Sequence, residues 1–126
     1  MNYFNARHGL VVVRVEIFGP AQVQVARLAL DTGATDTTIR TAILESAGYD
    51  LARAAEHVSI VMGSNLIHAP VIELERFAAM EQERAAFPVI AHTLPQGATV
   101  DGVLGLDFMR GQRLTVDFRA GELSLS

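Results

Sequence analysis

Two segments near the start of the chain alternate apolar and polar residues. In residues 10–18 (LVVVRVEIF) the odd-numbered positions from 11 to 17 are apolar, whereas Arg14 and Glu16 are charged. A period of two is typical of a half-buried strand. Residues 22–30 (QVQVARLAL) alternate too, but the apolar positions shift by one at residues 26–27. We therefore predict a second strand with a bulge or sharp twist at that point.

The period changes in residues 38–48 (TIRTAILESAG). Ile39, Ile43, Leu44 and Ala47 recur at helical spacing. This pattern predicts a short helix of about two turns, with Thr38 as its cap and Gly48 as its stop.

β character returns in the middle of the chain. Residues 56–62 and 66–77 read as strands on either side of a turn at 63–65, which predicts a hairpin. Residues 78–86 (AAMEQERAA) have helical propensity but lie between strand-like runs, so the local pattern leaves helix and hairpin both open.

The last third of the chain predicts a helical turn over residues 104–112 and a closing hairpin over 114–126. Residues 1–9 show no clear period and read as a terminal arm. With 126 residues, half of them apolar, the chain has the length of one domain spanning residues 1–126. We expect a mainly β domain with one or two short helices.

Composition excludes several classes of function. The formal net charge is −4, with 10 basic and 14 acidic residues, so a nucleic-acid partner is not expected. The chain has no cysteine, which removes disulfides and thiolate chemistry. No apolar run approaches the roughly 20 residues that span a bilayer, and no signal peptide opens the chain. We expect a cytoplasmic protein that binds no membrane.

Candidate chemistry lies where the second predicted strand ends. The apolar run leads directly into Asp31, Thr32, Gly33 and Ala34. A strand would hold the aspartate, the threonine hydroxyl can fix neighbouring backbone, and the glycine allows a tight turn close to a ligand. Taken alone, this tetrapeptide is also ordinary turn chemistry.

A second motif, residues 103–108 (VLGLDF), stands about seventy residues further on. With both motifs present, the chain resembles the retropepsin-like aspartic peptidases, single-lobe proteins of the retroviral protease type. The matching stretches are LALDTGATDTTI, VSIVMGSNLIHAP and DGVLGLDFM, in the family's order. The resemblance implies a closed β-barrel of the acid protease fold, a flap hairpin over the site, and a hairpin rather than a helix at residues 78–86.

The resemblance also implies a function, that of an aspartic endopeptidase. Such a peptidase needs two carboxylates about 3 Å apart that share a proton, and the chain has one DTG motif. The resemblance therefore implies a homodimer in which each subunit contributes Asp31 as the catalytic residue. The water attacks an extended peptide held under the flap, and neither a metal nor another cofactor is required.

The family motifs assign further roles by position. The active-site loop and dimer contact comprise Thr32, Gly33 and Ala34; the substrate-binding positions are Gly33, Ala29, Thr38, Met62, Gly63, Ser64, Asn65 and Val103; and the residues that support the loop are Thr37, Gly105 and Asp107.

Two departures from the viral pattern bear on this site. Thr35 and Leu106 stand where viral members often carry a paired Asp and Arg. We expect hydroxyl–carboxylate bonds to replace that ion pair, with Thr35 or Thr37 bonded to Asp107. The flap carries one glycine, Gly63, in place of the viral run, so a shorter or stiffer tip is expected.

Other functions remain as alternatives. The foremost is an inactive peptide-binding or dimerisation module with the same fold, because a fold does not ensure an activity. The four histidines, at positions 8, 57, 68 and 92, have no metal-ligand spacing. Ser59 and Ser64 lack the glycines of a nucleophile elbow, which argues against a serine hydrolase.

Overall fold

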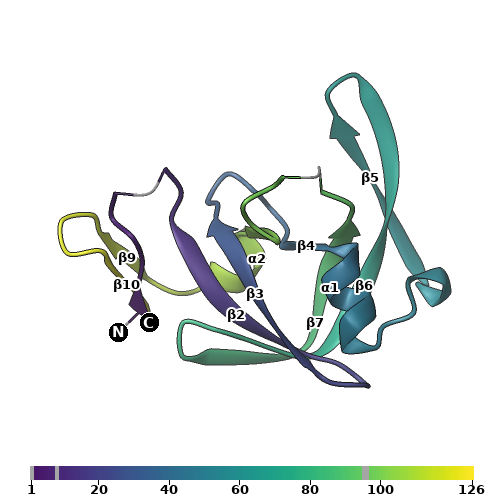
Figure 1. Ribbon diagram of the computed structural model, residues 1–126, viewed down its shortest axis with the longest axis horizontal. Coiled ribbons are helices and arrows are strands. Elements are labelled where there is room, and N and C mark those ends of the chain that lie inside the picture. Colours follow the sequence, from purple (N-terminus) through teal and green to yellow (C-terminus); the bar gives the residue numbers. More distant parts are fainter. Residues whose placement is uncertain (1, 8, 95–96) are drawn as a thin grey trace.

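The fold is described by a computed structural model that covers residues 2–7, 9–94 and 97–126. Six strands form a closed barrel (Figure 1). Around the ring they are β2 (Val12–Phe18), β3 (Val23–Leu30), β8 (Gly102–Leu104), β4 (Thr38–Arg40), β7 (Gln82–His92) and β6 (Asn65–Ala79). Antiparallel pairing of β6 with β2 closes the ring. The mainly β, barrel-type fold expected from the sequence is confirmed.

The remaining elements lie outside the ring. Strand β5 (Glu56–Met62) pairs only with β6 and forms a hairpin that projects from the barrel in Figure 1. A small sheet joins part of the predicted terminal arm to the closing hairpin in the order β1 (Asn2–Tyr3), β10 (Glu122–Leu125), β9 (Leu114–Asp117). The helical elements are α1 (Thr41–Ala47), the 3₁₀ turn η1 (Leu51–Arg53) and α2 (Leu106–Met109). None of the described helices is long and apolar enough to cross a membrane.

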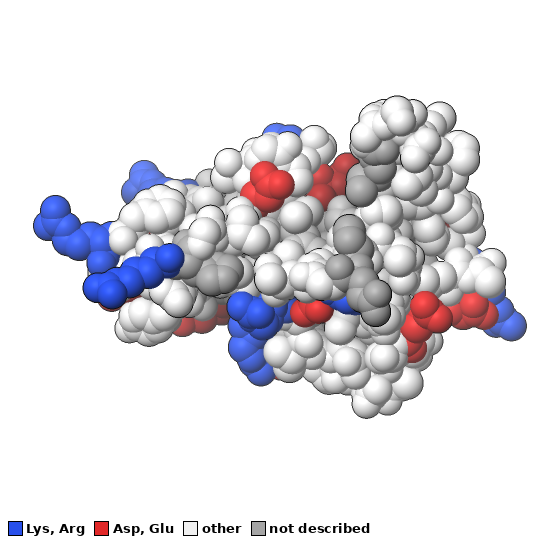
Figure 2. All heavy atoms as spheres, turned by 45° about the horizontal axis from the view of Figure 1, so that its top comes forward, with Lys and Arg blue, Asp and Glu red and all other residues white. Residues whose placement is uncertain are grey.

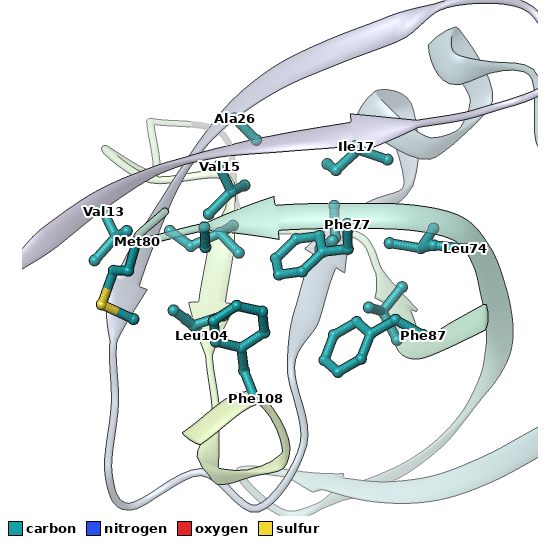
Figure 3. Packing of buried hydrophobic residues seen from close by; sticks show 14 of the residues in the cluster. Val13, Val15, Ile17, Ala26, Leu74, Phe77, Met80, Phe87, Leu104 and Phe108 are labelled. Carbon is teal, nitrogen blue, oxygen red and sulfur yellow. The ribbon is translucent and has the colours of Figure 1, made fainter. Parts of the chain in front are cut away.

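Three phenylalanines lie at the centre of the barrel core (Figure 3). Phe77 of β6 and Phe87 of β7 stack with their ring centroids 5.0 Å apart. Phe108 of α2 meets these two rings edge-on, at 5.5 and 5.9 Å. All three side chains are buried. Since each such aromatic pair adds about 0.5–1.5 kcal/mol beyond area burial, Phe108 attaches α2 firmly to the barrel.

The predicted bulge near residues 26–27 is wrong. Strand β3 pairs with β2 in one unbroken register from Val12↔Ala29 to Phe18↔Val23. The even-numbered residues face inward throughout, and Val23 and Val25 lie on the outer face with 46% and 48% of their surface exposed. The apolar positions shift because Val23 and Val25 are exposed on the outer face and not because the strand bulges.

The helix of residues 38–48 is shorter than predicted, and Thr38 is not its cap. Residues 38–40 form β4, since they pair with both β7 and β8, and α1 begins at Thr41 with no side-chain cap. The predicted stop is confirmed, because Gly48 is left-handed (φ 107°) and its N–H donates to the carbonyl of Glu45.

The hairpin expected from the family at residues 78–86 is confirmed. Strands β6 and β7 pair up to Ala79↔Gln82, and Met80 and Glu81 form the two-residue turn with φ of 48° and 64°. Two consecutive positive φ angles are typical of a type I′ hairpin turn. The hairpin pairing between β6 and β7, together with the long-range pairing of β6 with β2, overrides the helical propensity of this segment.

Candidate functional site

Asp31 lies at the first position after β3, at the start of the loop formed by residues 31–37. Its N–H donates to the carbonyl of Leu104 in β8 at 3.0 Å, and its carbonyl accepts the N–H of Ala34 at 3.2 Å. The N–H of Gly33 donates to Oδ1 of the Asp31 carboxylate at 2.8 Å. Backbone groups from two segments therefore fix the position of a half-buried carboxylate.

The tip of this loop is open to another molecule. Thr32 and Gly33 are exposed. A Cβ atom on residue 33 would lie 3.1 Å from Oδ1 of Asp31, tighter than most van der Waals contacts. Glycine at this position leaves room beside the carboxylate, as a substrate or partner chain would require.

Thr37 anchors the far end of the loop and is the one polar residue in the described chain that is fully buried, at 0% exposure. Its hydroxyl donates to Oδ1 of Asp107 at 2.7 Å and accepts the N–H of Gly105 at 3.1 Å. Its own N–H donates to Oδ2 of Asp107 at 2.9 Å. Of the two threonines expected to bond Asp107 through a hydroxyl, the structure selects Thr37. Thr35 contributes its carbonyl, which accepts the N–H of Asp107 at 3.2 Å.

Gly105 allows α2 to pack directly beneath the loop. A Cβ atom at this position would lie 2.7 Å from the carbonyl carbon of Asp36 and 2.9 Å from the carbonyl oxygen of Ala34. Next to it, the N–H of Leu106 donates to that same Ala34 carbonyl at 2.8 Å. Only glycine permits this close approach, so the two motifs singled out in the sequence form a single unit.

Three predicted substrate-binding residues lie side by side across the sheet. Val103 of β8 pairs with Ala29 of β3 on one side and with Thr38 of β4 on the other. Residues paired in this way point to the same face of a sheet. None of the three belongs to the barrel's core cluster. They therefore form a row on the outer face of the barrel, beginning two residues before Asp31.

Sequence reasoning missed two residues that continue this row. Ile90 of β7 pairs with Thr38, and Val71 of β6 pairs with Ile90. No local signal could have identified them, because their position depends on a parallel pairing between β4 and β7 across some fifty residues of chain.

The predicted flap residues lie at the tip of the β5–β6 hairpin. Met62 pairs with Asn65, and Gly63 and Ser64 form the turn between them. The structure describes the backbone of Met62 but not its side chain. In Figure 1 the tip stands apart from the 31–37 loop, so the structure does not bring Gly63, Ser64 and Asn65 to Asp31.

The part of the chain that the structure describes contains no cluster of three or more His, Cys, Asp or Glu residues that could hold a metal ion. His68 instead bonds Ser59 across the flap hairpin, at 3.1 Å between Nδ1 and Oγ. His8 lies outside the described residues.

Comparisons with known proteins found similarity to a family and to solved structures. The family described as aspartyl protease matches residues 13–108, which include both the Asp31 loop and most of α2. No significant match was found among curated proteins. Among solved structures, a retropepsin-like aspartic protease from Rickettsia conorii superposes with a TM-score of 0.70 and is 17% identical in sequence. The superposition covers 98% of this chain and 85% of the Rickettsia conorii chain. At this identity, the likeness shows a shared fold.

Proposed function

Because the chain belongs to the aspartyl protease family, we propose that it is an aspartic endopeptidase that acts as a homodimer. The observation that carries the proposal is Asp31 itself. Its carboxylate is held by the Gly33 N–H on a loop that Thr37 and Asp107 anchor from below. These contacts hold a carboxylate in place at an open surface, where it can act as an acid or a base. The fold by itself would not require a carboxylate at this position.

The dimer follows from the number of suitable carboxylates. Hydrolysis by this chemistry uses two carboxylates about 3 Å apart that share one proton. Within one chain, Asp107 is unsuited to be the second, because its two oxygens accept the Thr37 hydroxyl, the Thr37 N–H and the Phe108 N–H. A two-fold axis that brings a second Asp31 beside the first supplies the missing group.

In the dimer, one Asp31 acts as general base and the other as general acid. The ionised carboxylate takes a proton from a water molecule, which attacks the scissile carbonyl carbon, while the protonated carboxyl donates to the carbonyl oxygen. The tetrahedral intermediate then collapses as the C–N bond breaks: the amine takes the proton that the base removed from water, and a hydroxyl of the intermediate returns its proton to the other carboxylate.

The substrate lies extended between the loop and the flap. The row Ala29, Val103 and Thr38 forms the floor for its side chains, and backbone groups at Gly33 and near Gly63 bind its main chain as an added strand. The tip of the β5–β6 hairpin stands apart from the loop of residues 31–37 in Figure 1, and closure of this hairpin over the peptide would bring Gly63, Ser64 and Asn65 toward it.

Cleavage of a diverse peptide library by wild type and by Asp31→Asn tests the activity. We expect the variant to lose about 10²–10⁴-fold in rate, because an amide cannot exchange the proton. The control Glu45→Gln, an exposed acid on α1, keeps wild-type activity. If the wild type is a folded dimer and cleaves nothing, the peptidase proposal fails and a peptide-binding module remains.

A mixing experiment tests the shared site. When Asp31→Asn is added in equal amount to a fixed amount of wild type and subunits exchange, activity falls to about half, because mixed dimers contain one intact carboxylate. Unchanged activity after verified exchange would contradict a site formed by two subunits.

A further inference from the structure

A cavity of about 450 Å³ lies between the active-site loop and the base of the flap. Its lining comes from three places: Asp36 of the loop with Asp107 beneath it, the flap residues Glu56, Val58 and Val71, and β7 from Phe87 to Ile90. None of the sequence motifs pointed to it. Its walls are therefore made of the same two elements that the proposed function places on either side of a peptide.

The sheet register connects this cavity to the proposed substrate row. The row of Ala29, Val103 and Thr38 continues to Ile90, then to Val71, and ends at Glu56, each residue paired with the next. Ile90 is only 8% exposed, yet it stands outside the barrel's core cluster. The last three residues of the row line the cavity, so a peptide that follows the row passes over it.

The cavity combines an apolar floor with an acidic rim. Its apolar floor is formed by Val71, which is half-buried, and Ile90, which is 8% exposed, whereas Asp36 and Glu56 are exposed at its edge. Among the lining residues that the structure describes, every ionisable one is acidic. Figure 2 shows acidic atoms in the recess beside the flap hairpin.

The two rim carboxylates are available to a ligand. Among the residues that the structure describes, neither Asp36 nor Glu56 has a side-chain hydrogen bond or an ion pair. Asp107, in contrast, is committed to Thr37 and to the N–H of Phe108. The cavity therefore presents two unmatched negative charges above an apolar floor.

We propose that this cavity binds the side chain of a Lys or Arg residue of the substrate. These two side chains carry an aliphatic stem that can pack on Val71 and Ile90, and a cation that reaches the carboxylates at the rim. A neutral side chain can pack on the apolar floor but does not pair with the carboxylates at the rim. A short charged side chain does not fill the space above the floor. The inference rests on the proposed function, because it treats the row as the path of a peptide substrate.

The position of the basic residue follows from the row. Val71 is four strand positions from Ala29, about 19 Å in a flat sheet and less in a curved one. An extended peptide rises about 3.3 Å per residue, which places the basic residue about three to five residues from the scissile bond. In the proposed dimer the cavity occurs twice, so the preference applies on both sides of that bond.

The test compares peptides that differ at one residue. A peptide cleaved by the wild type receives Lys, Arg, norleucine, Gln or Glu at each position three to five residues from the bond, and kcat/KM is measured for each. We expect Lys and Arg to exceed norleucine and Gln by about threefold to tenfold at one of these positions, and Glu to be the poorest. Higher salt reduces this ratio.

Variants of the rim assign the preference to the cavity. In the double variant Asp36→Asn/Glu56→Gln the Lys-to-norleucine ratio falls to about one, and in Glu56→Lys the Glu peptide overtakes the Lys peptide. Glu45→Gln removes the same charge from α1, away from the cavity lining, and keeps the wild-type ratio.

The outcomes separate the inference from the function. Cleavage without a basic preference at positions three to five, or a preference that survives in the double variant, overturns the inference and leaves the peptidase intact. If no peptide is cleaved by a folded dimer, the proposed function fails and the inference fails with it.

Discussion

The hydroxyl of Thr37 offers a direct test of how the active-site loop is held. The substitution Thr37→Val keeps the β-branched shape and replaces the hydroxyl with a methyl group of similar size. That hydroxyl makes two hydrogen bonds, to Oδ1 of Asp107 at 2.7 Å and from the N–H of Gly105 at 3.1 Å. The side chain is fully buried, so water cannot replace either partner.

The expected cost can be worked out from these two bonds. A hydrogen bond to a charged group contributes about 1.5–3 kcal/mol, and a buried N–H left without an acceptor costs about 1–3 kcal/mol. Asp107 keeps two backbone donors, from Thr37 and Phe108, which moderates the first loss. We therefore expect Thr37→Val to lower the free energy of unfolding by about 3 kcal/mol, a large part of the 5–15 kcal/mol typical of a domain.

The assay is urea unfolding followed by circular dichroism. Wild type and variants are compared at one protein concentration, because the apparent stability of the proposed dimer would depend on concentration. Thr37→Ser is the matched control: it keeps the hydroxyl, loses one methyl group and is expected to cost about 1 kcal/mol. The reasoning is refuted if Thr37→Val costs less than about 1 kcal/mol, or if the serine variant is as unstable as the valine variant.

Two further substitutions test other parts of the chain. The phenol of Tyr49 donates to the carbonyl of Phe18 at 2.6 Å and accepts the N–H of Glu75 at 2.8 Å, so Tyr49→Phe should lower the free energy of unfolding by about 1–3 kcal/mol in the same urea assay. Burial raises the pKa of Tyr49 above 10.0. Above pH 10 the folded state therefore keeps a proton on Tyr49 that the unfolded state releases. The free energy of unfolding of the wild type should fall more above pH 10 than that of Tyr49→Phe. In Ala34→Ser, a hydroxyl that donates to the carboxylate of Asp31 favours the charged form of that carboxylate. The acidic limb of the pH–activity profile should therefore move down by about half to one pH unit. An unmoved limb in an active variant would show that residue 34 does not act on the carboxylate.

Several elements could be predicted because they are fixed by short-range patterns. The alternation in residues 10–18 and the turn chemistry near the chain's end produced correct strands and a correct closing hairpin. Gly48 marked the end of α1 because a left-handed residue there favours glycine. The pairing of two motifs, DTGA and VLGLDF, identified the family correctly, since both must be present for α2 to pack under the loop.

Local patterns failed where distant contacts decide the outcome. Thr38 looked like a helix cap, but hydrogen bonds to β7 and β8 make it part of β4. The shift of apolar positions after Val23 and Val25 predicted a bulge, but the β2 register is unbroken and places these two side chains on the outer face. In each case the energy of pairing across the sheet exceeds the local preference.

The sequence by itself determined the chemistry available to these 126 residues: one aspartate on a tight glycine turn, and no cysteine. The tertiary structure decided which groups surround that aspartate. Only the closed register aligns Ala29, Val103 and Thr38 with Ile90, Val71 and Glu56, because each pair is a cross-strand neighbour between segments far apart in the chain. Cross-strand pairing has no local signature, so a pocket built from it becomes visible only once the barrel closes.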